Sequence, residues 1–296
     1  MKSGTVAVIG RANAGKSTLI NVLVGEKVSI VSPKPQTTRD RILGILTEKD
    51  YQIVFADTPG LYKADGALNR FMQRTADGTA KEVDLILFVI DGHAGLKNDD
   101  LAILKGYADR YKNIVAVMTK TDIMPDSEIP MELVKFSEIG VDVVPVSARK
   151  GKNLKELIKV ILAKLPEGEK LFTQDIISDR SERFMISEIM REKILLKFDK
   201  EIPHGVAILV NEFKKRPTGN LYDISIDIVC EKPAHKAILI GKQGSAIREV
   251  SSFAREDMEK FLSAKVFLTT YVKVKEDWRN SESLLREYGY SQKDYE

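Results

Sequence analysis

One glycine-rich segment, VIGRANAGKST at residues 8–18, constrains this chain more than any other part of it. Residues 10–17 match the pattern G-x-x-x-x-G-K-[ST], between an apolar run at 5–10 that predicts a strand and a helical pattern from Lys16 to about Val24. Small residues there let successive backbone N–H groups face phosphate oxygens, and the helix N-terminus adds its positive dipole end. The segment therefore predicts a phosphate-binding loop in an α/β fold. A strand–helix turn without a ligand is the alternative, and the flanking pattern disfavours it.

The chemistry of the loop assigns roles to its residues. Lys16 is expected to reach the β- and γ-phosphates, and the Ser17 hydroxyl is expected to bind Mg²⁺. The residues of this segment expected to contact a nucleotide are Gly10, Asn13, Ala14, Gly15, Lys16, Ser17 and Thr18.

The first half of the chain alternates apolar runs with amphipathic patterns. Val- and Ile-rich runs at 84–91, 113–120 and 141–148 are followed by helical patterns near 98–111, 129–138 and 153–165. Such alternation is typical of a mostly parallel sheet with helices on both faces. Runs at 41–48 and 51–58, separated by two residues, predict a hairpin that adds one antiparallel edge strand.

Three further short motifs follow predicted strands in this half: DTPG at 57–60, TKTD at 119–122 and SAR at 147–149. A carboxylate at Asp122 pairs with the N1–H and 2-amino group of guanine, which adenine does not offer. We therefore expect a GTP site at the carboxyl ends of the strands. A surface turn explains any one of these motifs, but not all of them in this order. The contacts expected from them are Asp57 (Mg²⁺ through water), Thr58, Pro59, Gly60 (N–H to the γ-phosphate), Thr119, Lys120 (packed over the base), Asp122, Ser147, Ala148 (N–H to guanine O6) and Arg149.

This set of motifs resembles the translation-factor-related GTPases, and QTTRDR at 36–41 resembles the first switch of their Era-like branch. The resemblance assigns the metal-binding switch threonine to Thr38 in preference to Thr37. It implies GTP hydrolysis with Mg²⁺ held by Ser17, Thr38 and Asp57. The catalytic set that it implies is Lys16, Ser17, Thr38, Asp57 and Gly60.

Two positions depart from the pattern of that family. The guanine motif normally begins with Asn, which braces the phosphate loop, and here it begins with Thr119. Many GTPases place a catalytic Gln where this chain has Leu61, which cannot orient water, so slow intrinsic hydrolysis is expected. Relatives with an apolar residue there often use a K⁺ ion held partly by an Asn of the loop. Asn13 occupies that position, and the alternative is that it only braces the loop.

A second glycine motif, GKQG at 241–244, lies in the other half of the chain. It lacks the span and the Ser/Thr of a nucleotide loop and resembles the G-x-x-G loop of a KH domain. The surrounding pattern is a helix (181–198), two strands (205–216, 221–231), a helix (233–240), the loop, a helix (245–262) and a strand (265–275), which suits the bacterial type II topology. A plain helix C-cap is the alternative. The residues expected to contact RNA are Ile238, Ile240, Gly241, Lys242, Gln243, Gly244 and Arg248.

We therefore predict a P-loop GTPase domain over 1–168, a linker over 169–180, an α+β type II KH domain over 181–280 and a tail over 281–296. The resemblance covers nearly the whole chain and implies a switch that binds small-subunit ribosomal RNA and the small ribosomal subunit and assists its maturation. Two alternatives stay open. In one, the chain is an RNA-binding protein with GTP as a structural ligand. In the other, it is a GTPase of RNA modification.

Composition adds bounds to this interpretation. The net charge of +3 makes no bulk polycation, so RNA binding depends on local placement. The first residues run into a predicted strand and no apolar run reaches about 20 residues, so neither a signal peptide nor a transmembrane segment is expected. The single cysteine, Cys230, excludes an intrachain disulfide and favours a reducing cytoplasm. The resemblance adds possible peripheral association with the inner membrane, and a monomer is expected.

Overall fold

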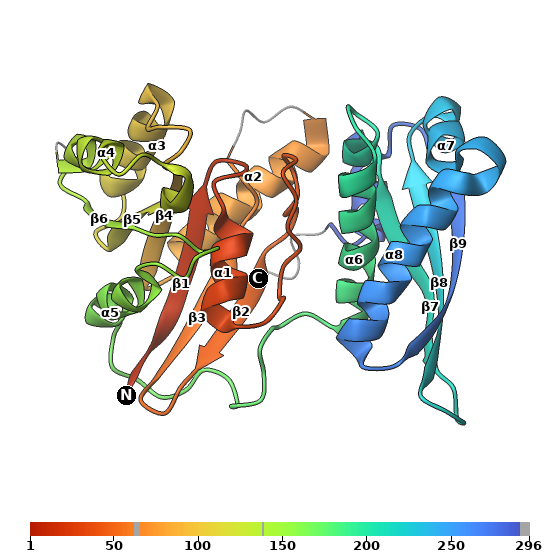
Figure 1. Ribbon diagram of the computed structural model, residues 1–296, viewed down its shortest axis with the longest axis horizontal. Coiled ribbons are helices and arrows are strands. Elements are labelled where there is room, and N and C mark those ends of the chain that lie inside the picture. Colours follow the sequence, from red (N-terminus) through yellow and green to blue (C-terminus); the bar gives the residue numbers. More distant parts are fainter. Residues whose placement is uncertain (62–65, 138, 291–296) are drawn as a thin grey trace. The chain divides into compact units, whose positions relative to one another are not determined.

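The computed structural model describes residues 1–61, 66–137 and 139–290, and its contacts divide the chain into two compact units (Figure 1). The first unit is made of Met1–Val31, Thr38–Lys63 and Met72–Asp179. The second is made of Ser32–Thr37, Ala64–Phe71 and Arg180–Glu296. Two short pieces of the first half of the sequence thus group with the second half.

The first unit contains a six-stranded sheet with the strand order β2-β3-β1-β4-β5-β6. Its strands are β1 (Lys2–Gly10), β2 (Ile42–Thr47), β3 (Tyr51–Asp57), β4 (Leu85–Asp91), β5 (Ile114–Thr119) and β6 (Asp142–Pro145). Strand β2 pairs antiparallel with β3 at one edge, and all other pairs are parallel. The predicted mostly parallel sheet with one antiparallel edge strand is confirmed.

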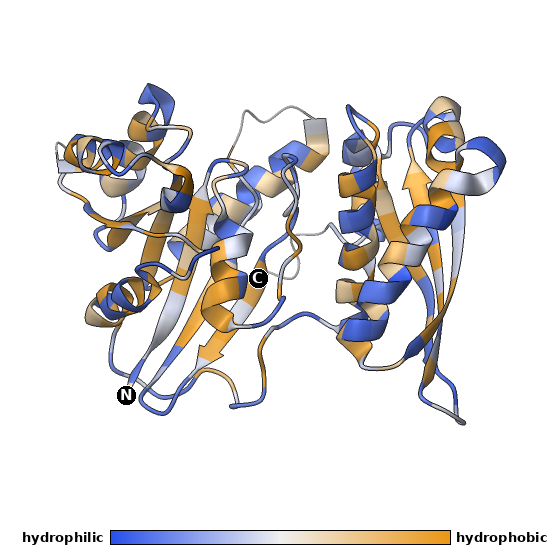
Figure 2. Ribbon diagram, viewed as in Figure 1, coloured by the Kyte–Doolittle hydropathy of each residue, from blue (hydrophilic) through white to orange (hydrophobic). Residues whose placement is uncertain are grey.

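Helices cover both faces of this sheet because its strands are apolar along most of their length (Figure 2). The helices are α1 (Lys16–Val24), α2 (Gly66–Lys81), α3 (Asn98–Ala108), α4 (Glu128–Ser137) and α5 (Leu154–Lys164). Val6 and Val8 of β1 pack in one cluster with α1 and α5. Ala7 and Ile9, which point the other way, pack in a second cluster with α3 and α4.

Helix α2 was absent from the sequence-based prediction. Its sequence is polar and contains two glycines, which weakens the helical signal. In the structure Met72, Ala76 and Ala80 are all buried, at a spacing of four residues. Burial of that face outweighs the low intrinsic propensity.

The second unit is built on a three-stranded sheet with the order β7-β8-β9. Its elements are α6 (Glu182–Lys197), β7 (Ala207–Lys215), β8 (Leu221–Cys230), α7 (Pro233–Ile240), α8 (Ser245–Leu262), β9 (Lys265–Val274) and α9 (Glu282–Glu287). Strands β7 and β8 are antiparallel, whereas β8 and β9 are parallel. Helices α6 and α8 pack against each other and against the sheet, in a core that includes Ile189, Ile226 and Met258. The predicted KH element order is confirmed, and the last six residues, for which a loose tail was predicted, lie outside the described residues.

Candidate GTP site and RNA-binding loop

The phosphate loop joins β1 to α1 at the carboxyl edge of the first sheet. At Gly10 a side chain is impossible without a backbone shift, because an added Cβ would lie 2.2 Å from the Val89 carbonyl oxygen. Asn13 (φ 63°) and Gly15 (φ 91°) both adopt left-handed backbone conformations. These turns form the loop immediately before the N-terminus of α1, where phosphate binding is favoured.

Lys16 lies beneath this loop and is buried. Its Nζ donates hydrogen bonds to the carbonyl oxygens of Gly10 (3.1 Å) and Arg11 (3.0 Å). Burial lowers the pKa of Lys16 to about 8, although the neighbouring Asp57 opposes the shift. A buried ammonium group that donates to two carbonyl oxygens is a cation that a phosphate would stabilise.

The three residues expected to hold Mg²⁺ meet at one point, although they come from α1, the segment before β2 and the end of β3. The Ser17 hydroxyl donates to Asp57 Oδ2 at 2.6 Å and lies 3.0 Å from the Thr38 hydroxyl oxygen. The Thr38 hydroxyl lies 3.3 Å from the same Asp57 oxygen. Sequence positions 17, 38 and 57 are thus gathered into a cluster of oxygen atoms, which are the ligands that Mg²⁺ prefers.

Asp57 has further features that suit a cation. Its Oδ1 atom is buried and has no hydrogen-bond partner among the described residues. Burial raises the pKa of Asp57, while the hydrogen bond from Ser17, the charge of Lys16 and the nearby Ser29 and Thr38 hydroxyls act in the opposite direction. A buried carboxylate with a free oxygen is costly unless a positive charge compensates it. The residues therefore fit a magnesium ion.

The residues after Asp57 approach the phosphate loop closely. The Thr58 hydroxyl donates to the Val8 carbonyl at 2.8 Å, and Pro59 is buried. An added Cβ at Gly60 would lie 2.8 Å from both Cα and N of Ala12, so only glycine fits there. The Leu61 N–H donates to the Gly10 carbonyl at 3.0 Å, and its side chain packs against an apolar cluster.

The Thr119 hydroxyl group contacts the phosphate loop, which the usual Asn at this position braces. That group donates to the carbonyl oxygen of Ala14, in the phosphate loop, at 2.6 Å and lies 3.0 Å from the carbonyl oxygen of Ile90. Thr119 and Ala14 are 2% and 3% exposed, so the contact is shielded from water. The loop is therefore tied to β5 despite the departure from the family pattern.

The residues expected to bind guanine lie after β5 and β6. The Asp122 carboxylate accepts a hydrogen bond of 2.6 Å from the Ser147 hydroxyl, and this bond lowers the pKa of Asp122. Lys120 has a left-handed backbone (φ 60°), and its Nζ pairs with Asp91 Oδ2 at 2.6 Å. Ala148 is half-buried and Arg149 is exposed. Asp91 was missed by the sequence analysis, although its position at the end of β4 carries the same strand-end signal.

The GKQG loop of the second unit has a strongly turned backbone. Gly241 (φ 73°), Gln243 (φ 52°) and Gly244 (φ 76°) all have positive φ. An added Cβ at Gly241 would lie 2.7 Å from the Cβ atom of Ala246, so a larger residue would displace the start of α8. Such a turn leaves room for a nucleic-acid backbone to approach the main chain.

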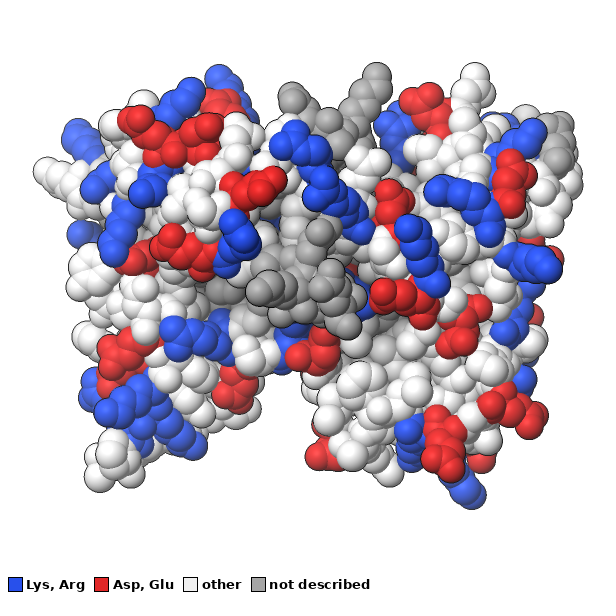
Figure 3. Space-filling view, turned by 180° about the vertical axis from the view of Figure 1, so that it is seen from behind, with Lys and Arg blue, Asp and Glu red and all other residues white. Residues whose placement is uncertain are grey.

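Side chains around this loop face solvent. Lys242, Gln243 and Arg248 are exposed, and the structure gives their side chains no hydrogen bond or ion pair with any described residue. Ile238 is 49% exposed and Ile240 is half-buried, whereas Leu239 between them is in the core. On the face drawn in Figure 3, basic and acidic side chains are interspersed. The candidate RNA site is therefore marked by the turned backbone of the loop and by the exposed side chains beside it.

Comparisons with known proteins match a different family model to each half of the chain. The family model described as a 50S ribosome-binding GTPase matches residues 5–120, and the KH domain model matches residues 201–279. The GTPase Era of Clostridium kluyveri is 45% identical over 292 residues, which are 98% of this chain and 99% of that protein.

Two solved structures are similar over nearly the whole chain. One is Era in complex with MgGDPNP and nucleotides 1506–1542 of 16S ribosomal RNA, with a TM-score of 0.95 at 38% identity, covering 98% of this chain and 99% of that one. The other is an Aquifex aeolicus Era variant bound to GDP and AlF4−, with a TM-score of 0.93 at 38% identity, covering 98% and 100% of the two chains.

Proposed function

This chain belongs to the Era family of GTPases, and on that premise we propose that it is a switch whose GTP state controls binding to small-subunit ribosomal RNA. It is a GTPase that uses guanine nucleotide and Mg²⁺. We propose further that the RNA binds at the GKQG loop and that the chain thereby assists maturation of the small ribosomal subunit.

The exposed GKQG loop is the observation that carries the RNA proposal. Its positive φ values turn the main chain sharply, and the exposed side chains of Lys242 and Gln243 are available to the phosphates of an RNA backbone. Ile238 and Ile240, directly before the loop, offer apolar surface for unstacked bases. The similar Era structure that contains a 16S RNA fragment supports the choice of partner.

Co-sedimentation with small ribosomal subunits tests the proposal. Binding is compared with GDPNP, with GDP and without nucleotide, for the full chain and for the Lys242→Ala/Gln243→Ala variant. Lys232→Ala is the matched control, because Lys232 is also exposed but lies at the other end of α7. We expect binding favoured by GDPNP, lost in the loop variant and kept in the control. Equal binding with GDPNP, with GDP and without nucleotide would instead support an RNA-binding protein in which GTP is a structural ligand.

We propose that Ser17, Thr38 and Asp57 hold Mg²⁺ and that Lys16 and the N–H of Gly60 stabilise the charge that develops on the γ-phosphate. Their arrangement around one cluster of oxygen atoms supports these roles. The apolar Leu61 packs against the core and offers no group to orient water, so we expect slow hydrolysis by the isolated chain.

We also propose that Asn13 helps to bind a K⁺ ion that replaces an arginine finger. Its left-handed backbone places it at the outer turn of the phosphate loop, and its side chain is exposed. Hydrolysis measured in KCl and in NaCl of equal ionic strength tests the idea. We expect faster hydrolysis in KCl and no such difference in Asn13→Ala. Equal rates in both salts for the unmodified chain would rule out the ion.

We propose, finally, that the protein is cytoplasmic and monomeric and that it attaches peripherally to the inner membrane. No helix among the described residues has the length and apolar character needed to cross a bilayer. Sedimentation of the purified chain with and without vesicles containing anionic lipid measures both its mass and any attachment.

A further inference from the structure

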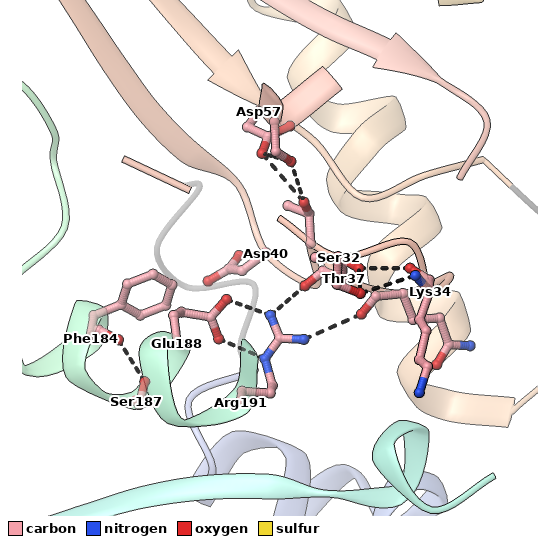
Figure 4. Close-up of polar contacts among 12 residues, drawn as sticks. Ser32, Lys34, Thr37, Asp40, Asp57, Phe184, Ser187, Glu188 and Arg191 are labelled. Atoms are coloured by element: carbon pink, nitrogen blue, oxygen red, sulfur yellow. Dashed lines mark hydrogen bonds and ion pairs between the residues drawn. The ribbon is translucent and has the colours of Figure 1, made fainter. Parts of the chain in front are cut away.

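A buried ion pair on α6 contacts the main chain directly before Thr38, the threonine proposed to bind Mg²⁺ (Figure 4). Arg191 is 1% exposed and is paired with Glu188, one turn earlier on the same helix. Its Nε donates to Glu188 Oε1 at 2.8 Å, and one terminal nitrogen donates to Glu188 Oε2. This two-point contact orients the guanidinium group and leaves donors for other acceptors.

Those remaining donors bind two consecutive carbonyl oxygens. One terminal nitrogen of Arg191 donates to the carbonyl of Gln36 at 3.3 Å, and the other donates to the carbonyl of Thr37. Thr38 is the next residue of the chain, and its hydroxyl lies in the cluster of oxygen atoms that we propose holds Mg²⁺. Arg191 does not touch that cluster, but it binds the peptide group that joins Thr37 to Thr38.

The segment 32–37 has further contacts that belong to the same unit. The Thr37 hydroxyl donates to the Lys34 carbonyl at 2.7 Å, which closes a local turn. The Lys34 ammonium pairs with Asp199 at 2.7 Å, just beyond the end of α6. Residue Arg191 of α6 and Asp199 in the turn after α6 therefore hold this segment at two points, and the Arg191 contact is the nearer of the two to Thr38.

Helix α6 is also connected to the RNA-binding loop by packing. It packs against α8, and α8 begins at Ser245, immediately after the GKQG loop. One side of α6 contributes Ile186, Ile189 and Ile194 to the core of the second unit. A change in how α6 sits in that core would therefore move the Arg191 side chain and the carbonyls that it binds.

We infer that Arg191, oriented by Glu188, is a positioning residue that sets Thr38 for magnesium binding and links the RNA-binding unit to the GTP state. The inference deepens the proposed function and rests on the proposed role of Thr38. In the GTP state the first switch is held by Mg²⁺ and the γ-phosphate, and it is released after hydrolysis. The Arg191 contact should therefore affect GDPNP binding far more than GDP binding.

A magnesium titration of nucleotide binding tests this inference on the full chain. Fluorescent GDPNP and GDP are titrated at a series of Mg²⁺ concentrations with the unmodified chain, Arg191→Lys, Thr38→Ala and the double variant. Lysine keeps the charge but loses the planar fork that contacts a carboxylate and two carbonyls together. We expect Arg191→Lys to raise the Mg²⁺ concentration for half-maximal GDPNP binding by roughly 5- to 150-fold, the usual range for coupling between sites, and to leave GDP affinity within about twofold.

The double variant separates positioning from general damage. If Arg191 acts through Thr38, its replacement adds little to Thr38→Ala, whereas an independent structural effect would add in full. Arg183→Lys is the matched control, because Arg183 is also on α6 and binds a carbonyl, that of Val210, but does not contact residues 32–37. It should leave the magnesium dependence unchanged.

Each outcome has a distinct meaning. A shift with Thr38→Ala but none with Arg191→Lys overturns the inference and leaves the proposed magnesium site standing. No shift with Thr38→Ala overturns the proposed site itself. If Arg191→Lys does not fold, Glu188→Gln/Arg191→Met replaces the pair without leaving a lone buried charge, and the same shift is expected from it. Unchanged magnesium dependence in that variant also overturns the inference.

Discussion

The hydroxyl brace between Thr119 and the phosphate loop gives a prediction whose size follows from the structure. Thr119→Val keeps the shape of the side chain but removes the donor that Ala14 O receives at 2.6 Å. Leaving a buried acceptor without its donor costs about 1–3 kcal/mol, which corresponds to roughly 5- to 150-fold in affinity. Because the contact is made to the main chain of the loop, GDP and GDPNP should lose affinity by the same factor.

Titration with fluorescent GDP and GDPNP measures this effect, and thermal melting of each variant shows whether the fold is retained. Thr119→Ser is the matched control, since it keeps the hydroxyl and should bind nucleotide nearly as the unmodified chain does. Preference for guanine should not change in either variant, because Asp122 is untouched. If Thr119→Val binds GDP as tightly as Thr119→Ser does, the hydroxyl does not brace the loop and the argument fails.

Three other predictions concern the same site. Asp122→Asn should weaken GTP binding by at least about 100-fold and favour xanthosine triphosphate, because the amide no longer accepts both guanine donors. Competition binding measures the two affinities, and an unchanged GTP affinity would contradict the guanine assignment. The pKa of Lys16, lowered to about 8 by burial, should rise when phosphate binds, so nucleotide binding should take up a proton above pH 8 and weaken as pH rises, by at most about tenfold per pH unit. Calorimetry at pH 8.5 in buffers of different ionisation enthalpy detects that proton, and its absence there would show that Lys16 stays charged in the free site. Gly60→Ala should lower kcat by about 100-fold, because the added Cβ would lie 2.8 Å from the Ala12 backbone and displace the N–H that we propose contacts the γ-phosphate. Single-turnover hydrolysis measures the rate, and an unchanged rate would contradict the prediction.

The places of the candidate site residues in the fold were predictable, because these residues lie in short motifs at the ends of strands. Each of β1, β3 and β5 is followed by a motif, and parallel strands bring such ends to one edge of the sheet. The glycine positions follow from the same local logic, since Gly10 and Gly241 have no space for a side chain. These features depend on the backbone near each residue, which a sequence pattern describes well.

Only the tertiary structure shows the contacts between residues that are distant in sequence. Thr119 reaches Ala14 across 105 positions, and Arg191 reaches Gln36 across 155. The sequence did not show which residues of the apolar run before the GKQG loop are buried. The structure buries Leu239 and leaves Ile238 exposed. Helix α2 likewise forms because packing buries one of its faces, against its own weak propensity. A pattern tells which residues share a face of an element, but the partner of that face is set by how all the elements pack.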